Sequence, residues 1–482
     1  MNTHEHYYQA LISRDPRFDG AFFVGVSSTG VYCRPVCRVR TPKPENCHFY
    51  ASAALAEAAG YRPCLRCRPE LAPAHTWHDT RGQAIIAAIE TVELAGHGVC
   101  DLTSVAKHLD LSTRHLNRLA LDHLGVPLTR FLQTRRLLKA KKLLTETHLS
   151  ITEIAFLCGF GSLRSLHHHF QKAYRLTPTA IRKSAQHKKP PTDNILSLML
   201  SYRPPYDWHG LIQFLGNRTI AKVEHVHEGV YYRTVQVHYQ SAIHQGWLAV
   251  KPHPTINNAL NIDISERLSG ALPLILYRLQ HQFDLHADPM RIDQALGALA
   301  VPHQGVRLPG AFDGFEMAIR AILGQQITVK AAHTLAGRFA EAFGEKVDTP
   351  FENLSVLFPS PQTVASLSKD EIASLGIIGK RADTIITLAK AIAEGNLDLS
   401  PAAAPEMTIQ SLVCLPGIGD WTAHYIAMRA LHWPDAFPHK DLGIMKALNE
   451  THPKTLLATA EQWRPWRAYA VMHLWKRLEN PL

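Results

Sequence analysis

Residues 412–443, LVCLPGIGDWTAHYIAMRALHWPDAFPHKDLG, decide the fold of the carboxy-terminal half of the chain. A short glycine turn, Pro416-Gly417-Ile418-Gly419, separates two segments with helical periodicity. The glycines permit a tight turn whose backbone N–H groups can point at a phosphate. Asp441 follows Gly419 by 22 positions. The stretch therefore predicts two helices around a phosphate-binding turn, followed by a carboxylate.

The aromatic residues of this stretch also share a face of the predicted helix. Trp421 and Tyr425 stand at positions i and i+4, where helical side chains are neighbours. Such a pair lines a binding pocket or packs in the core, and the spacing fits both. Asp441 also has two interpretations. It is a catalytic carboxylate, or it is the N-cap of a helix, because it directly precedes Leu442.

The length and the charge of the chain indicate its number of domains and its kind of partner. The chain has 482 residues, which is typical of three to four domains. Residues 1–190 hold 26 Lys and Arg against 14 Asp and Glu, whereas residues 191–482 hold 25 against 27. The basic front indicates a polyanionic partner such as nucleic acid. No run of about 18 apolar residues and no signal-peptide core occur, so we expect a soluble cytoplasmic protein without a membrane partner.

Four of the eight cysteines form two close pairs. Cys33 and Cys37 are spaced C-x3-C, and Cys64 and Cys67 are spaced C-x2-C. In a cytosolic chain, short spacings of this kind favour a zinc site over disulfides, since four thiolates complete a tetrahedral Zn²⁺ site. A hairpin over 22–33 delivers the first pair. Cys47 lies outside both pairs and is interpreted as a bystander.

Residues 83–182 have a helical pattern with two helix–turn–helix units. A basic helix over 135–144 joins them, and its charges are interpreted as a solvated face or as phosphate contacts: Arg135, Arg136, Lys139, Lys141 and Lys142. The polar stretch SAQHKKPPTDN (184–194) predicts an interdomain linker. Beyond it, 196–299 mixes strand and helix, and the pattern is helical from Gly314 onward.

The front module resembles the amino-terminal zinc domain of the Ada family. The resemblance rests on RDPRFDGAFFVGVSSTGVYCRPVC (14–37) and FYASAALAEAAGYRPCLRCRPE (49–70). It implies Zn²⁺ bound by Cys33, Cys37, Cys64 and Cys67, with Cys33 also accepting a methyl group from a DNA phosphotriester. A zinc-bound sulfur stays a thiolate, which is the nucleophilic form, and its methylation removes negative charge that would face phosphates. A purely structural zinc is the alternative.

The helical array resembles the AraC-type double helix–turn–helix. DLTSVAKHLDLSTRHLNRLALDHLGVPLTRFLQTRRLLKAKKLL (101–144) and ITEIAFLCGFGSLRSLHHHFQKAYRLTPTAIR (151–182) carry the match. Recognition helices place their first residues against base edges in the major groove. The resemblance puts these DNA contacts on Arg114, His115, Asn117, Arg118, Arg164 and Ser165.

The rear half resembles AlkA-type 3-methyladenine DNA glycosylases of the helix–hairpin–helix superfamily. LSYRPPYDWHGLIQFLGNRTI (200–220), RLPGAFDGFEMAIRAILGQQITVKAA (307–332), the opening stretch and EQWRPWRAYAVMHLW (461–475) carry this match. The resemblance implies Asp441 as the catalytic carboxylate and Gly417 and Gly419 as phosphate contacts. Trp421 and Tyr425 would line the pocket for the flipped base, and Trp463, Trp466 and Tyr469 fit either pocket or core.

One departure and one agreement refine this expectation. Gln326 stands where AlkA itself carries a leucine wedge that enters the DNA. Trp421, Thr422 and Ala423 occupy the positions where strand-cleaving relatives carry a nucleophilic lysine. The resemblance thus implies a monofunctional glycosylase that leaves an abasic site.

Together these observations predict a multidomain, mainly α chain. The expected parts are a small α/β zinc methyl-acceptor domain (1–78), an all-α double helix–turn–helix (79–184), a linker (185–195), an AlkA-like α+β subdomain (196–300) and an all-α helix–hairpin–helix glycosylase domain (301–482). The expected function is an adaptive response to DNA alkylation, combining transcription activation with excision of alkylated bases. The expected partners are double-stranded DNA and RNA polymerase, for a monomer associated with the nucleoid. The alternative is a DNA-binding regulator whose glycosylase-like half is a non-catalytic sensor.

Overall fold

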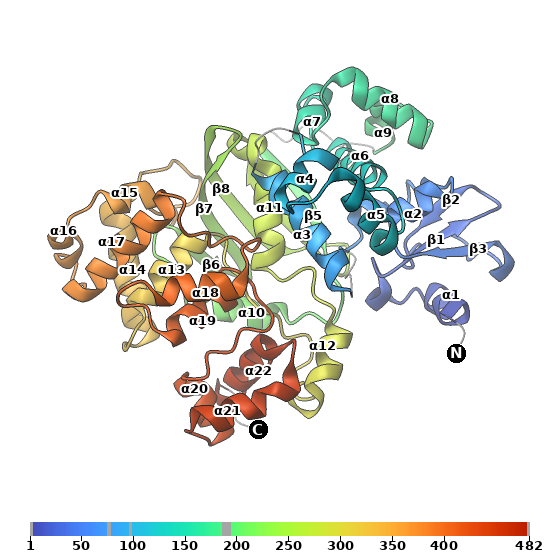
Figure 1. Cartoon of the computed structure of the whole chain (residues 1–482). Helices are drawn as coiled ribbons and strands as arrows, with labels where there is room; N and C mark the ends of the chain where they lie inside the picture. Colours follow the sequence, from blue (N-terminus) through green and yellow to red (C-terminus); the bar gives the residue numbers. More distant parts are fainter. Residues whose placement is uncertain (1–2, 75–78, 96–98, 186–193, 480–482) are drawn as a thin grey trace. The chain divides into compact units, whose positions relative to one another are not determined.

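The computed structural model describes residues 3–74, 79–95, 99–185 and 194–479. Two compact units divide the chain: the first holds residues up to Pro204 with His238–Ile243 and His253–Leu274, and the second holds the remainder. Helices predominate over strands in both units, as Figure 1 shows. The expected multidomain, mainly α architecture is confirmed. Most of the expected linker falls on 186–193, outside the described residues.

The amino-terminal module is a small sheet flanked by two helices. Its elements are α1 (Thr3–Ser13), β1 (Phe23–Val26), β2 (Val31–Cys33), β3 (Cys47–Tyr50), α2 (Ala53–Ala58) and β4 (Arg62–Pro63). The strand order is β3-β1-β2-β4, with β1 and β2 antiparallel and β2 and β4 parallel. Cys33 ends β2 and Cys64 directly follows β4, so the parallel pairing delivers one cysteine of each pair to the same edge of the sheet.

The helix–turn–helix array comprises α3 (Thr80–Leu94), α4 (Leu102–His108), α5 (Thr113–Leu124), α6 (Leu128–Glu146), α7 (Ile151–Leu157), α8 (Leu163–Tyr174) and α9 (Pro178–Ser184). Side-chain oxygens cap the free N–H groups at the start of both recognition helices, with Ser112 capping α5 and Ser162 capping α8. The leucines and alanines on the inner faces of α3 to α6 form one buried cluster. The predicted pair of helix–turn–helix units is confirmed.

The prediction of a solvated basic face on α6 is wrong. Lys141 is 1% exposed and forms an ion pair with Glu70, and the ammonium of Lys142 donates to the carbonyl of Met199 at 2.6 Å. Arg135 and Lys139 pair with Glu93, and Arg136 donates to the carbonyl of Cys100. Acidic and carbonyl partners far away in the sequence take up these charges.

A five-stranded sheet follows, in the order β5-β9-β8-β7-β6. Its strands are β5 (Ile195–Ser201), β6 (Glu224–His227), β7 (Val230–Tyr239), β8 (Ala242–Pro252) and β9 (Ala259–Ser265). The associated helices are α10 (Trp208–Gly216), α11 (Leu272–Gln282) and α12 (Pro289–Leu296). β5 pairs antiparallel with β9, and β6 pairs antiparallel with β7. The expected mixture of strand and helix is confirmed.

The remaining helices build the body that carries the glycine turn. They are α13 (Gly314–Leu323), α14 (Val329–Phe343), α15 (Pro361–Ala365), α16 (Lys369–Ala373), α17 (Gly379–Ala393), α18 (Pro405–Val413), α19 (Asp420–Arg429), α20 (Leu442–Leu448), α21 (Pro453–Ala460) and α22 (Arg467–Glu479). Apolar side chains of α13, α14, α17 and α19 share one buried cluster. Within the described ranges, no helix is long and apolar enough to cross a membrane.

Candidate functional site

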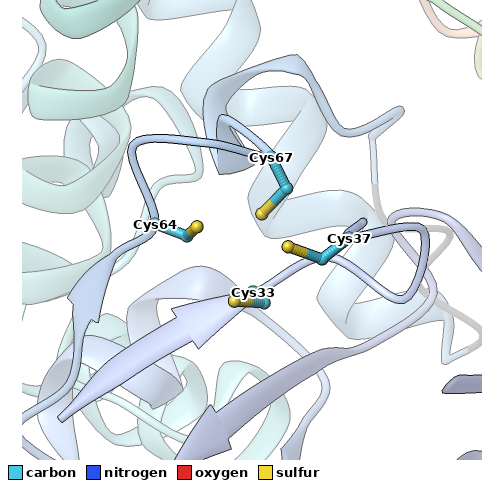
Figure 2. Close-up of side chains that lie close together, drawn as sticks. All are labelled: Cys33, Cys37, Cys64 and Cys67. Atoms are coloured by element: carbon cyan, nitrogen blue, oxygen red, sulfur yellow. The ribbon is translucent and has the colours of Figure 1, made fainter. Parts of the chain in front are cut away.

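The four predicted cysteines converge. Figure 2 shows their side chains directed toward a common centre, and their sulfur atoms all lie within 4.8 Å of one another. Tetrahedral zinc with Zn–S bonds of 2.3 Å places its sulfurs about 3.8 Å apart, so the group fits Zn²⁺. Four thiol donors leave no position for water, as in closed zinc sites. In the part of the chain that the structure describes, this is the one such group of three or more potential ligands. The cofactor is Zn²⁺.

The four sulfurs differ in their hydrogen bonds. The backbone N–H of Arg34 donates to the sulfur of Cys67 at 3.3 Å, and backbone N–H groups also donate to Cys37 and Cys64. A donated N–H draws electron density from a thiolate, so the sulfur of Cys67 is a weaker nucleophile for the bond from Arg34.

Cys47 stands apart from this group, as expected. Its thiol donates to the carbonyl of Lys43 at 3.3 Å, and burial raises its pKa, which keeps it a thiol. Cys47 is buried and packs with the apolar side chains of the amino-terminal module.

Arg34 is a functional residue that sequence reasoning missed. Its guanidinium is 11% exposed, forms an ion pair with Asp19 and donates to the carbonyl of Cys67 at 3.1 Å. Burial lowers the pKa of Arg34, but the pairing with Asp19 outweighs this and raises it. A fixed cation thus lies beside the cysteine cluster and offsets part of its negative charge. Its position next to Cys33 in the sequence was the available signal.

The predicted base-reading residues lie at the starts of the two recognition helices. Arg114, His115 and Arg118 on α5 are exposed, and Arg164 on α8 is exposed as well. Asn117 is half-buried, and its side-chain oxygen accepts the N–H of Leu128 at 3.1 Å. Ser165 is half-buried, with its backbone N–H bonded to the cap. The four exposed side chains are available to DNA, whereas Asn117 already serves the turn into α6.

The glycine turn has the geometry that the sequence predicts. Gly417 has a φ of +88°, and a Cβ there would lie 2.0 Å from the hydroxyl of Thr384. Gly419 begins α19 without a side-chain cap, so the first N–H groups of this helix are open to a ligand. Ile418 between them is buried and anchors the turn. Backbone amides can therefore hold a phosphate here without a basic side chain.

A neighbouring loop is fastened to this turn. The amide of Gln325 donates to the carbonyl of Gly417 and to the hydroxyl of Thr422, both at 3.0 Å. The next residue, Gln326, is exposed and has a φ of +55°, a conformation that non-glycine residues rarely adopt. Gln326 therefore lies at the surface, in the loop that is bonded to the glycine turn, and its role at the DNA stays a prediction.

A cavity of about 390 Å³ lies behind the turn. Its lining includes Trp421, Tyr425, Asp441, Trp475 and Arg218. Trp421 and Tyr425 stack with ring centroids 5.3 Å apart and 5° between their planes. Their common face therefore borders a cavity, which favours the pocket interpretation over core packing. The volume and the aromatic walls suit a flat heterocycle.

Asp441 points its carboxylate between two tryptophans. The indole N–H of Trp475 donates to Oδ1 at 2.9 Å, and that of Trp421 donates to Oδ2 at 3.0 Å. The backbone N–H of Ile444 also donates to Oδ1 at 3.0 Å. Asp441 is thus both the N-cap of α20 and a wall of the cavity, so the capping interpretation does not exclude the catalytic one, which stays a prediction. Three donors fix the direction of the carboxylate.

Trp475 is a residue of the cavity wall that the sequence did not reveal, and Arg429 is a residue that holds this wall from behind. Arg429 is buried and donates to the hydroxyl of Tyr425 at 3.0 Å. Burial raises the pKa of Tyr425, but Arg429 and two neighbouring arginines outweigh it and lower the pKa. Trp475 reaches the cavity through tertiary packing, so no local motif marks it.

The other aromatics belong elsewhere. Trp463 and Tyr469 are buried in the core, and the hydroxyl of Tyr469 donates to Asp284. Trp466 stacks edge-on against Tyr469 and is not among the residues that line the cavity.

Fold and sites together define a zinc-binding, helix–turn–helix protein joined to a helix–hairpin–helix base-excision module. Four family matches agree with this class: the metal binding domain of Ada (6–70), a helix-turn-helix domain (105–184), the AlkA N-terminal domain (197–313) and the HhH-GPD superfamily of base excision DNA repair proteins (319–463).

A relative aligns with almost the whole chain. A Mycobacterium tuberculosis protein described as a probable bifunctional transcriptional activator/DNA repair enzyme AlkA is 34% identical over 495 residues, covering 99% of this chain and 97% of its own length. The chain belongs to this family of bifunctional activator/repair enzymes.

Two relatives match one half each. Escherichia coli DNA-3-methyladenine glycosylase 2 is 35% identical over 57% of this chain and 95% of its own length. The Escherichia coli bifunctional transcriptional activator/DNA repair enzyme Ada is 32% identical over 38% of this chain and 50% of its own length.

Removal of the metal should unfold the amino-terminal module. A sheet this small lacks a large core, and structural zinc contributes about 10 kcal/mol or more to such folds. We expect chelation to release one zinc ion per chain and to abolish the circular dichroism of this module. Cys37→Ser should lower the bound zinc measured by mass spectrometry, whereas Cys47→Ser should leave it unchanged. Equal zinc loss in both variants would contradict the assigned ligand set.

Gly417→Ala should weaken DNA binding through the turn. The new methyl group clashes with Thr384, and the strained turn misdirects amides whose bonds to a charged group contribute about 1.5–3 kcal/mol. We expect affinity for a duplex with an abasic site to fall about tenfold or more in fluorescence anisotropy. Gly395→Ala is the matched control, because Gly395 also has a positive φ but a Cβ there meets nothing within 4 Å. The control should retain wild-type affinity.

Proposed function

We propose that the chain both senses DNA alkylation and repairs it. It transfers a methyl group from a DNA phosphotriester to Cys33, activates transcription in that methylated state, and excises alkylated bases of the 3-methyladenine type as a monofunctional glycosylase. The observation that carries the repair activity is the carboxylate of Asp441, held by two indoles inside an aromatic cavity. The observation that carries the sensing activity is the convergence of four cysteine sulfurs, that of Cys33 among them, within 4.8 Å of one another.

Base excision follows from the charges in the cavity. Cleavage of the N-glycosidic bond leaves positive charge on the sugar, and the fixed carboxylate of Asp441 stabilises it. A water then adds at the anomeric carbon and gives up its proton, while the bond electrons leave with the base. Alkylated purines are electron-poor, and the stacked faces of Trp421 and Tyr425 attract them. No lysine stands at 421–423, so the reaction ends at the abasic site.

The turn and the neighbouring loop supply the grip on DNA. Amides at Gly417 and Gly419 bind a backbone phosphate, and Gln326 fills the space that the flipped nucleotide leaves. Both lie next to the helix that carries Trp421. Phosphate binding and extrusion of the base therefore take place next to the cavity that receives the base.

Methyl transfer is a displacement at carbon. Zinc, when bound, keeps the ligand sulfurs as thiolates at neutral pH. The sulfur of Cys33 attacks the methyl carbon of a phosphotriester, a C–S bond forms, the C–O bond breaks, and the phosphodiester anion leaves with the bond electrons. The product thioether carries no charge, so the cluster loses one negative charge. Reduced repulsion of DNA phosphates then favours binding by the methylated chain.

We place the chain on double-stranded DNA as a monomer. Two helix–turn–helix units in one chain present two recognition helices without a second subunit, which supports this assignment. Activation implies contact with RNA polymerase at the promoter, and the DNA-binding modules imply a location at the nucleoid.

Asp441→Asn should abolish base release. The substitution removes the negative charge that stabilises the developing cation, and loss of one such group costs about 100- to 1,000-fold in rate. We expect free 3-methyladenine from methylated DNA to fall by that factor, while affinity for abasic DNA persists. Absence of release by the wild type would instead favour a regulator with a non-catalytic sensor half.

Methylated DNA should mark Cys33 with one methyl group. Peptide mass spectrometry after incubation with DNA rich in methyl phosphotriesters should find the added mass on the peptide containing Cys33. Cys33→Ala should acquire none, although its three remaining cysteines are intact. A methyl group on Cys37, Cys64 or Cys67 in the wild type would refute the assignment of the acceptor.

A further inference from the structure

The helix that joins the two helix–turn–helix units is also bonded to the zinc module. Glu57 at the end of α2 is 6% exposed and bridges the two. It accepts a hydrogen bond from the hydroxyl of Tyr32 at 3.0 Å and one from the hydroxyl of Thr134 on α6 at 2.7 Å. Tyr32 directly precedes Cys33. One buried carboxylate thus connects the strand that ends in the methyl acceptor with α6.

A second bridge starts at the other cysteine pair. Arg68 follows Cys67 with a φ of +53° and donates to Glu70 at 3.0 Å. The other carboxylate oxygen of Glu70 pairs with the ammonium of Lys141 on α6, and these side chains are 0% and 1% exposed. Arg68 also reaches Glu146 on the same helix at 2.8 Å. The loop that holds Cys67 is therefore fixed to α6 by a buried ion network.

The same helix holds both recognition elements. Gln133 of α6 bonds to His169 of recognition helix α8 at 2.8 Å. The N–H of Leu128, at the start of α6, donates to Asn117 of recognition helix α5 at 3.1 Å. Apolar packing adds to this, since Leu138 of α6 contacts the cluster around Phe23 and Tyr32. α6 therefore touches both the cysteine loops and the two recognition helices.

We propose that Thr134 and Lys141 are positioning residues that make the zinc module and the two recognition helices one DNA-binding body. Neither residue touches DNA or the methyl group. Rotation of the zinc module on α6 would leave the buried ammonium of Lys141 without its carboxylate and would break the bond from Thr134 to Glu57, so these contacts hold the module in place. The inference rests on the proposed methyl transfer to Cys33.

This arrangement determines whether methylation of Cys33 also strengthens DNA binding by the recognition helices. The loss of one negative charge at Cys33 acts on phosphates near the zinc module. When that module is fixed to α6, it binds phosphates in the same event in which α5 and α8 contact the bases. Its stronger binding to phosphates then adds to the affinity of the recognition helices. When the bridges are loosened, the zinc module binds phosphates without improving the hold of the recognition helices. The gain in sequence-specific affinity on methylation therefore depends on the bridges.

The test compares Lys141→Met with Lys139→Met in the full-length, zinc-loaded chain. Both lysines lie on α6 and pair with a glutamate, but the partner of Lys139 is Glu93 within the helix–turn–helix array itself. The probe is a duplex obtained by in vitro selection against the methylated wild-type chain. Dissociation constants are measured before and after methylation, and mass spectrometry verifies the methyl group on Cys33 in each variant.

We expect Lys141→Met to reduce the affinity gain on methylation by about three- to thirtyfold, the range of measured coupling effects, at unchanged zinc content. Lys139→Met should keep the wild-type gain. Thr134→Val, which removes one hydroxyl at nearly constant volume, should reduce the gain in the same direction and decides the case if Lys141→Met fails to fold.

Two outcomes overturn the inference in distinguishable ways. An undiminished gain in the methylated Lys141→Met and Thr134→Val variants refutes the positioning role alone. Absence of a methyl group on Cys33 of the wild type refutes the methyl-acceptor function and this inference with it.

Discussion

The carboxylate of Asp441, fixed by two indole N–H groups, is the interaction on which the carboxy-terminal half depends. Trp421 comes from the first turn of α19, Trp475 from α22, and Asp441 itself begins α20. Three helices therefore meet at one charged group. Because a buried polar group is costly unless it is hydrogen-bonded, these donors are needed to hold the carboxyl group among the aromatic rings. The cavity and the glycine turn share α19, so the two cannot be displaced independently.

Local spacing was enough to predict the metal ligands and much of the cavity. Two short cysteine spacings and a hairpin sufficed for the cysteine cluster, because each ligand pair lies at or just after the end of one of two adjacent strands, β2 and β4. The glycine turn with Asp441 sufficed for the hairpin, and the i, i+4 spacing put Trp421 and Tyr425 on one face. The overall class of fold followed from the same stretches.

Contacts between residues far apart in the sequence could not be predicted from local patterns. Trp475 reaches Asp441 from 34 positions away, and Arg34 becomes important only through its pairing with Asp19. The basic face on α6 was wrong for the same reason, since Lys141 finds its partner Glu70 71 positions upstream. A row of charged residues along a helix indicates a solvent-exposed face only when no acidic residue from a distant part of the sequence packs against it. Part of the excess positive charge of the front half is thus neutralised inside the protein, and part stays on exposed arginines such as Arg114 and Arg164.

The buried pair of Lys141 and Glu70 has a consequence for how such chains can be built. Lys141 without Glu70 would leave an uncompensated charge in the interior, which costs about 3–5 kcal/mol. The zinc module is therefore not interchangeable by itself. A zinc module borrowed from another protein would have to arrive together with an α6 that matches its acidic residues. Recombination that keeps this buried pair therefore moves the zinc module and α6 as one piece.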